Sequence, residues 1–96
     1  LSRKDLAGTW TVHWGAVKAI FILKLNGDYE CIWPGSIYIG TWGINNKGEF
    51  CITESCTHQS WVNYSIIIAK GNKHKYHGIT GNNPTNQVQI TMERIR

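Results

Sequence analysis

Charged residues are scarce in this chain: Asp, Glu, Lys and Arg make up 17% of its 96 residues, below the usual fraction of about a quarter. No apolar run reaches the ~18 residues that a membrane-spanning helix needs, so we expect no membrane span. No linker, charge block or low-complexity segment divides the sequence. Because its length is that of one domain, we predict a single domain over residues 1–96.

Motifs for catalysis and for metal binding are also missing. The chain has no nucleophile motif such as Gly-x-Ser-x-Gly, and its six acidic residues are scattered along the sequence. The four histidines and three cysteines lack the tight spacing of a zinc site. We therefore expect a protein that is not an enzyme and that has neither a metal site nor a cofactor.

Aromatic and β-branched residues are abundant, which is typical of strands. The chain has five Trp, four Tyr and two Phe. From Gly8 onward apolar residues recur with the period of two that marks a half-buried strand; Trp10 and Val12, for example, share one face. This alternation predicts eight strands: Gly8–Trp14, Val17–Leu25, Asp28–Trp33, Ile37–Ile44, Glu49–Thr53, Ser60–Ala69, His74–Thr80 and Gln87–Ile95.

Short turns join these strands. Asn26-Gly27 is the strongest hairpin signal, because both residues can take a positive φ. The segment Gly27–Cys31 resembles Gly48–Cys51, which we interpret as a repeated hairpin geometry. Connections this short cannot carry parallel crossovers. We predict an all-β, antiparallel, eight-stranded up-and-down meander that closes into a small barrel, with an open sandwich of two four-stranded sheets as the alternative.

The two ends of the chain carry a family resemblance. Gly8-Thr9-Trp10 begins the first predicted strand, after a short segment that we expect to form a helical turn and plug one end of the domain. Arg94 lies near the end of the last strand. These features resemble the calycin group of barrels, which includes lipocalins, fatty-acid-binding proteins and avidins. The resemblance implies that Trp10 packs at the closed base of the barrel and that Arg94 or Arg96 lies over its ring.

The lipocalin-like resemblance favours a non-enzymatic module that binds a small apolar or amphipathic molecule at the open end of the barrel. The chain is shorter than typical lipocalins, and we expect no helix after its last strand. Its aromatic interior is therefore expected to be either a small pocket or a packed core. We expect the ligand to contact the aromatic residues at the open end, namely Trp14, Trp33, Tyr38 and Trp61.

Two other functions stay open. A protein-interaction or protease-inhibitor module would use the two longest loops, residues 54–59 and 81–86, because loops on a rigid barrel often carry recognition. An anion-binding module for nucleic acid or sulfated glycan would use the basic hairpin of residues 70–77, in a chain with a formal net charge of +4. Its candidate residues are Lys70, Lys73, Lys75 and Tyr76.

We expect the binding partner to be a small hydrophobic molecule or a protein. The outward faces of the predicted strands carry isoleucines, and we also place Ala19 there. Exposed apolar stripes of this kind favour a homo-oligomer.

Overall fold

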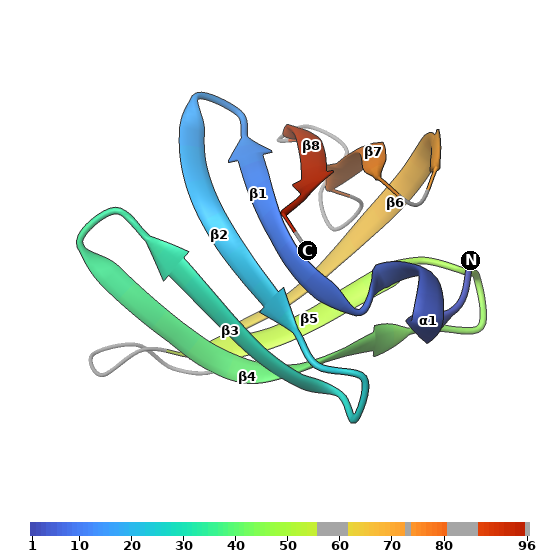
Figure 1. The fold of residues 1–96 in the computed structure, drawn as a ribbon, viewed down its shortest axis with the longest axis horizontal. Coiled ribbons are helices and arrows are strands. Elements are labelled where there is room, and N and C mark those ends of the chain that lie inside the picture. The colour runs from blue at the N-terminus through green and yellow to red at the C-terminus, as the bar shows by residue number, and fades with distance from the viewer. Residues whose placement is uncertain (56–61, 73, 81–86, 96) are drawn as a thin grey trace.

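A computed structural model describes residues 1–55, 62–72, 74–80 and 87–95, without the side chains of residues 62–64, 67, 69 and 70. Within these residues no helix has the length and apolar character needed to cross a membrane. One short helix precedes eight strands (Figure 1): α1 (Arg3–Leu6), β1 (Gly8–Trp14), β2 (Val17–Leu23), β3 (Asp28–Trp33), β4 (Ser36–Ile44), β5 (Phe50–Ser55), β6 (Val62–Asn72), β7 (Lys75–Thr80) and β8 (Gln89–Arg94).

The eight strands form one closed antiparallel barrel. Each strand pairs with the next one along the chain, and β8 pairs with β1. The predicted meander and its closure are therefore confirmed, and the alternative of an open sandwich is wrong. Among the described strands, pairing of the last with the first joins the two edges of the sheet, so every strand has a neighbour on both sides.

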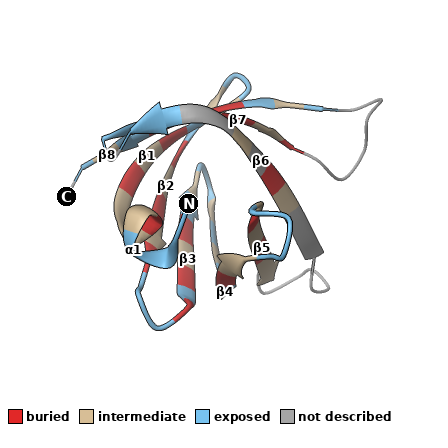
Figure 2. Cartoon of the chain, turned by 90° about the vertical axis from the view of Figure 1, so that its right-hand side faces the viewer, coloured by how far each residue is buried: buried red, intermediate tan, exposed pale blue. Residues whose placement is uncertain are grey.

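Inward side chains alternate with outward ones along the strands and build a single core (Figure 2). Burial of this apolar area is the main contribution to folding, at roughly 25 cal/mol per Å². Ala19 belongs to this core, because it lies on the same face of β2 as Phe21 and Leu23. Its predicted place on an outward face is wrong. The largest fully buried side chains include Trp10, Tyr29, Phe21, Phe50 and Leu6.

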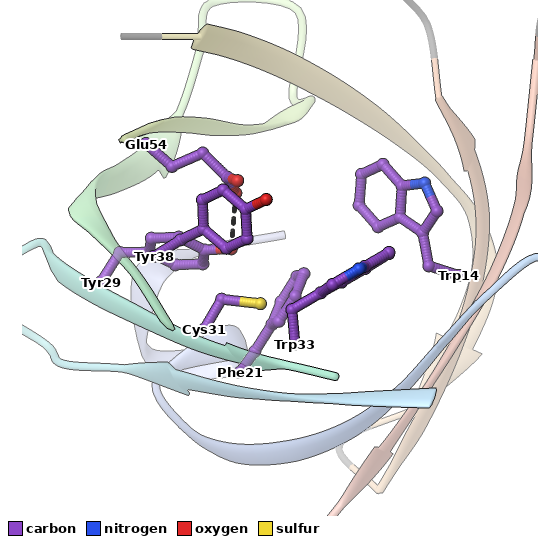
Figure 3. Close-up of a pocket in the computed structure, with 7 residues that line it drawn as sticks. All are labelled: Trp14, Phe21, Tyr29, Cys31, Trp33, Tyr38 and Glu54. Carbon is purple, nitrogen blue, oxygen red and sulfur yellow. Dashed lines mark hydrogen bonds between the residues drawn. The ribbon is translucent and has the colours of Figure 1, made fainter. Parts of the chain in front are cut away.

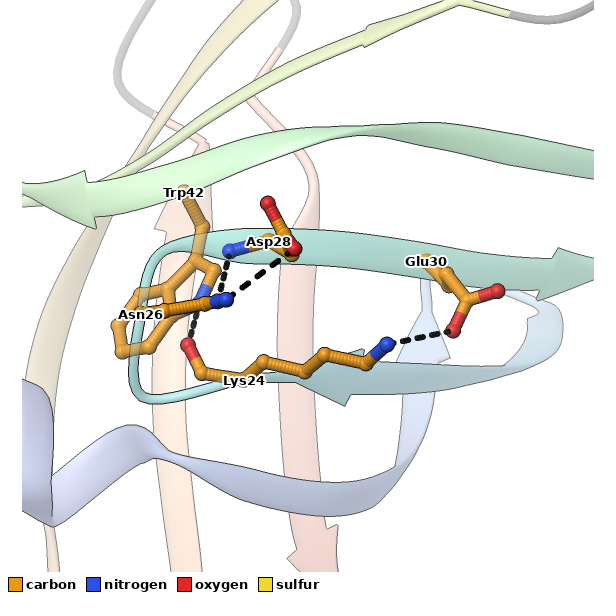
Figure 4. A network of polar contacts seen from close by, with 5 residues as sticks. All are labelled: Lys24, Asn26, Asp28, Glu30 and Trp42. Atoms are coloured by element: carbon orange, nitrogen blue, oxygen red, sulfur yellow. Dashed lines mark hydrogen bonds and ion pairs between the residues drawn. The ribbon is translucent and has the colours of Figure 1, made fainter.

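The β2–β3 turn differs from the predicted one. β2 ends at Leu23, and Leu25, predicted to be the last residue of this strand, is exposed in the turn. Gly27 N–H donates to the Lys24 carbonyl oxygen at 2.9 Å, and among these residues only Gly27 takes a positive φ. Asn26 accepts a hydrogen bond from Asp28 N–H at 2.9 Å through its side chain (Figure 4). The connection is therefore a four-residue turn closed by glycine, not a two-residue Asn-Gly turn.

The same hydrogen-bond pattern recurs at the β4–β5 turn. Gly48 N–H donates to the Asn45 carbonyl oxygen at 3.0 Å, and Asn45 N–H donates to Glu49 at 3.0 Å. Lys24 N–H donates to Asp28 in the corresponding way, also at 3.0 Å. The resemblance between the two segments that follow these turns thus reflects repeated hairpin geometry, as interpreted from the sequence.

α1 covers one end of the barrel, which we call the closed end. Leu6 is fully buried, and the Trp10 indole N–H donates to its carbonyl oxygen at 2.8 Å. The Arg94 guanidinium lies 4.2 Å from the centre of the Trp10 ring. It also donates to the carbonyl oxygens of Ala7 at 2.7 Å and Asp5 at 2.6 Å. Arg94 therefore takes the place that the resemblance implied, whereas Arg96 lies outside the described residues.

Replacing Arg94 by alanine is expected to lower the free energy of unfolding by about 2–4 kcal/mol, because the change removes two charge-assisted hydrogen bonds and a cation–π contact. Urea denaturation measures the loss. The exposed Lys18 provides the control, since Lys18→Ala removes the same charge with an expected effect of at most ~0.5 kcal/mol. Equal losses for the two variants would contradict this description of the closed end.

Gly40 allows β4 and β5 to approach each other closely. It pairs with Glu54 of β5 on one side and with Tyr29 of β3 on the other. A Cβ atom at Gly40 would overlap the backbone carbonyl oxygen of Thr53. At Gly43, three residues along the same strand, the nearest atom to such a Cβ is the Arg3 guanidinium at 3.5 Å, an ordinary contact.

This contrast predicts different effects of the same substitution at two positions of β4. Gly40→Ala is expected to lower the free energy of unfolding by about 3 kcal/mol, because the backbone of β5 must shift. Gly43→Ala is expected to change it by less than about 1 kcal/mol. Thermal unfolding of both variants measures the difference, and similar stabilities would show that the strands do not approach closely at Gly40.

Candidate functional site

A cavity of about 160 Å³ lies between the strands at the end of the barrel away from α1, which we call the open end. In an up-and-down meander, β1, β3 and β5 end on one side of the barrel and β4 begins there. These strand ends supply four of the lining residues, and the other three lie further along β2 and β3. The lining residues (Figure 3) are Trp14, Phe21, Tyr29, Cys31, Trp33, Tyr38 and Glu54.

Buried residues form the inner side of the cavity, and half-buried residues form its outer side. Cys31, Phe21 and Tyr29 are almost completely buried. The Trp14 and Trp33 rings meet edge to face, with centroids 6.3 Å apart and an interplanar angle of 78°. Phe21 and Tyr29 form a second edge-to-face pair at 5.4 Å. Such pairs are the favoured arrangement of aromatic rings, so the lining packs in a defined geometry.

One hydrogen bond crosses the cavity lining from β3 to β5. The Tyr29 hydroxyl donates to Glu54 Oε1 at 2.8 Å (Figure 3). The two residues lie on strands that are not neighbours, because β4 runs between them. The residue of β4 in register with both is Gly40, which has no side chain to separate the tyrosine from the carboxyl group.

Burial changes the protonation of this part of the cavity. It raises the pKa of the Glu54 carboxyl group above its ordinary value, and the hydrogen bond from Tyr29 only partly opposes this effect. Burial, the Cys31 thiol and the Glu54 carboxyl group together raise the pKa of Tyr29, so its hydroxyl stays protonated and can donate. Burial also raises the pKa of the Cys31 thiol to about 11. A neutral thiol is a poor nucleophile and a poor metal ligand.

The raised pKa of Glu54 predicts a pH dependence of stability. The folded chain holds this proton to a higher pH than the unfolded chain, whose glutamate pKa is 4.5. The stabilising contribution of Glu54 to the free energy of unfolding is therefore complete below about pH 4.5. It is lost as the pH rises through the raised pKa. Glu54→Gln is expected to remove this contribution, so that the variant gains stability relative to the natural chain between pH 4 and pH 8. Urea denaturation at both pH values measures the change.

Glu93 provides the matched control for this experiment. It is exposed on β8 and does not line the cavity. Glu93→Gln changes the net charge by the same amount, and its stability is expected to parallel that of the natural chain at both pH values. If the stability of Glu54→Gln also parallels that of the natural chain at both pH values, the raised pKa of Glu54 is contradicted.

The structure brings together three of the four residues predicted to contact a ligand. Trp14, Trp33 and Tyr38 line the same cavity, and Trp61 lies outside the described residues. Their role in binding stays a prediction. Glu54 was not among the predicted ligand contacts, because the sequence assigned it to the loop of residues 54–59, whereas β5 continues to Ser55. The alternation of inward residues along β5, extended by one step, gives the signal that points to Glu54.

Of the four residues predicted to bind an anion, the structure describes the side chains of Lys75 and Tyr76, and their role stays a prediction. Lys75 is exposed, but Tyr76 is only 7% exposed and belongs to the core. The Tyr76 ring lies 5.6 Å from the Trp10 ring. The side chain of Lys70 and the whole of Lys73 lie outside the described residues. The alternation of faces along β7 therefore separates the tyrosine from the exposed lysine.

The other predicted interaction surfaces are described only in part. Of the loops 54–59 and 81–86, residues 54 and 55 belong to β5 and the rest lie outside the described residues. On the outer face of β3 and β4, Ile32, Ile37 and Ile39 are 46%, 64% and 55% exposed. Exposed isoleucines were the basis for expecting a homo-oligomer, and that oligomer stays a prediction.

No cluster of three or more His, Cys, Asp or Glu side chains suited to a metal ion occurs among the residues that the structure describes. Comparison of the chain with models of protein families, with curated proteins and with solved structures found no match.

Proposed function

We propose that this protein is a non-enzymatic, lipocalin-like barrel that binds a small apolar or amphipathic molecule in the cavity at its open end. The observation that carries the proposal is the cavity of about 160 Å³ with an aromatic lining. Apolar rings around a few polar groups are typical of small-molecule sites. The half-buried state of Trp14, Trp33 and Tyr38 gives such a molecule access from solvent.

The size of the cavity limits the ligand. An apolar cavity of about 150 Å³ in another protein holds benzene, whereas sites for drug-sized molecules measure about 300–1,000 Å³. The cavity can therefore enclose a part of the ligand that is about the size of one aromatic ring. A retinoid or a fatty acid is too large to be enclosed here.

Membership of the calycin group is part of the same proposal. Its support is the closed end, where Gly8-Thr9-Trp10 begins β1 and Arg94 lies over the Trp10 ring. A barrel that is closed at one end by such a contact can hold a ligand only at the other end. The open-end cavity fits this arrangement.

Toluene tests the proposal, because it is one apolar ring of suitable size. We expect toluene to shift the indole N–H resonances of Trp14 and Trp33 in a saturable titration, and retinol to produce no such shift. Cys31→Met places a longer side chain at the inner side of the cavity, so it is expected to weaken toluene binding by about tenfold, or about 1.4 kcal/mol.

Cys51→Met is the matched control, since Cys51 lies on β5 outside the cavity lining. This variant is expected to bind toluene like the natural chain. No saturable shift with toluene, or equal weakening by the two methionine variants, would contradict ligand binding in the cavity.

A further inference from the structure

Among the described residues that line the cavity, Glu54 is the one that is acidic. A carboxylate half-buried beside aromatic rings loses hydration, and this loss is unfavourable unless a partner replaces the water. The Tyr29 hydroxyl donates a hydrogen bond to Glu54, but it is a neutral donor. Among the described residues the only ion pair joins Lys24 and Glu30, on the outer surface at 4.0 Å. No described cation therefore pairs with Glu54.

The aromatic residues around Glu54 are suited to a cation. The faces of Trp and Tyr rings carry negative electrostatic potential and attract ammonium groups within about 6 Å. Trp14, Trp33 and Tyr38 line the same small volume as the carboxyl group. Figure 3 shows the Glu54 carboxyl group pointing toward the space that these three side chains border.

We propose that the cavity binds a small molecule that carries a protonated amine beside a single apolar ring. The amine donates to the Glu54 carboxylate, while the ring packs between the indoles and the inner side formed by Phe21. The inference rests on the proposed function, because it assumes that the cavity takes a ligand. It adds the chemical class of that ligand.

The hydrogen bond from Tyr29 to Glu54 contributes to the selectivity of the cavity for a protonated amine. It holds one carboxyl oxygen of Glu54 at 2.8 Å and partly opposes the effect of burial, which raises the pKa of this carboxyl group. A bound ammonium opposes the effect of burial further, since an opposite charge nearby lowers the pKa of a carboxyl group. A ligand with a carboxylate or phosphate would instead face the like charge of Glu54. The cavity therefore discriminates by charge as well as by size.

Benzylamine and benzyl alcohol test the inference, because they match in shape and differ in charge at neutral pH. We expect benzylamine to bind about tenfold more tightly than benzyl alcohol, as an ion pair with hydrogen bonding is stronger than a neutral hydrogen bond. Glu54→Gln keeps the shape of the side chain and an acceptor for Tyr29. It is expected to abolish the preference for the amine while leaving the affinity for benzyl alcohol within about threefold.

Glu93→Gln is the matched control, because it removes one negative charge from the exposed surface of β8. It is expected to keep the tenfold preference. If benzyl alcohol and benzylamine bind equally to the natural chain, or if Glu54→Gln keeps the preference, the inference is wrong and the proposed function stands. If neither these probes nor toluene binds, the proposed function is wrong and the inference falls with it.

Discussion

Closure of the sheet between its last and first strands determines where the barrel is filled and where it can open. β8 pairs with β1 in the register that sets Arg94 opposite Trp10. Arg94 then covers the indole and bonds to the backbone just before β1. Because the edges are joined, the interior can open only at the two ends of the barrel. Leu6 and α1 fill one end, and the cavity lies at the other.

Much of this fold follows from the sequence, because side chains on a strand alternate with a period of two. β1 and β3 begin and end where the alternation predicted. Turn geometry was less predictable. The β2–β3 turn depends on the bond from Gly27 to Lys24, so Leu25 left the strand although it fits the apolar pattern. Ala19 was misplaced because its small side chain does not distinguish an inner from an outer face.

The candidate site was predictable where it depends on topology. In a meander, the ends of alternate strands meet at one side of the barrel, which groups Trp14, Trp33 and Tyr38. Glu54 was not predicted, because a glutamate after an apolar strand is more often exposed. Its inward position requires β5 to continue, and its contact with Tyr29 requires glycine between them on β4. These are properties of three strands together, not of one segment.

The proposed function requires that the ligand lies in the open-end cavity. Intermolecular nuclear Overhauser effects from the ring protons of bound benzylamine test it most directly, since these effects report only protons that lie close together. We expect these effects at the side chains of Trp14 and Trp33. Effects confined to the exposed Ile32, Ile37 and Ile39 on the outer face of the barrel would contradict it.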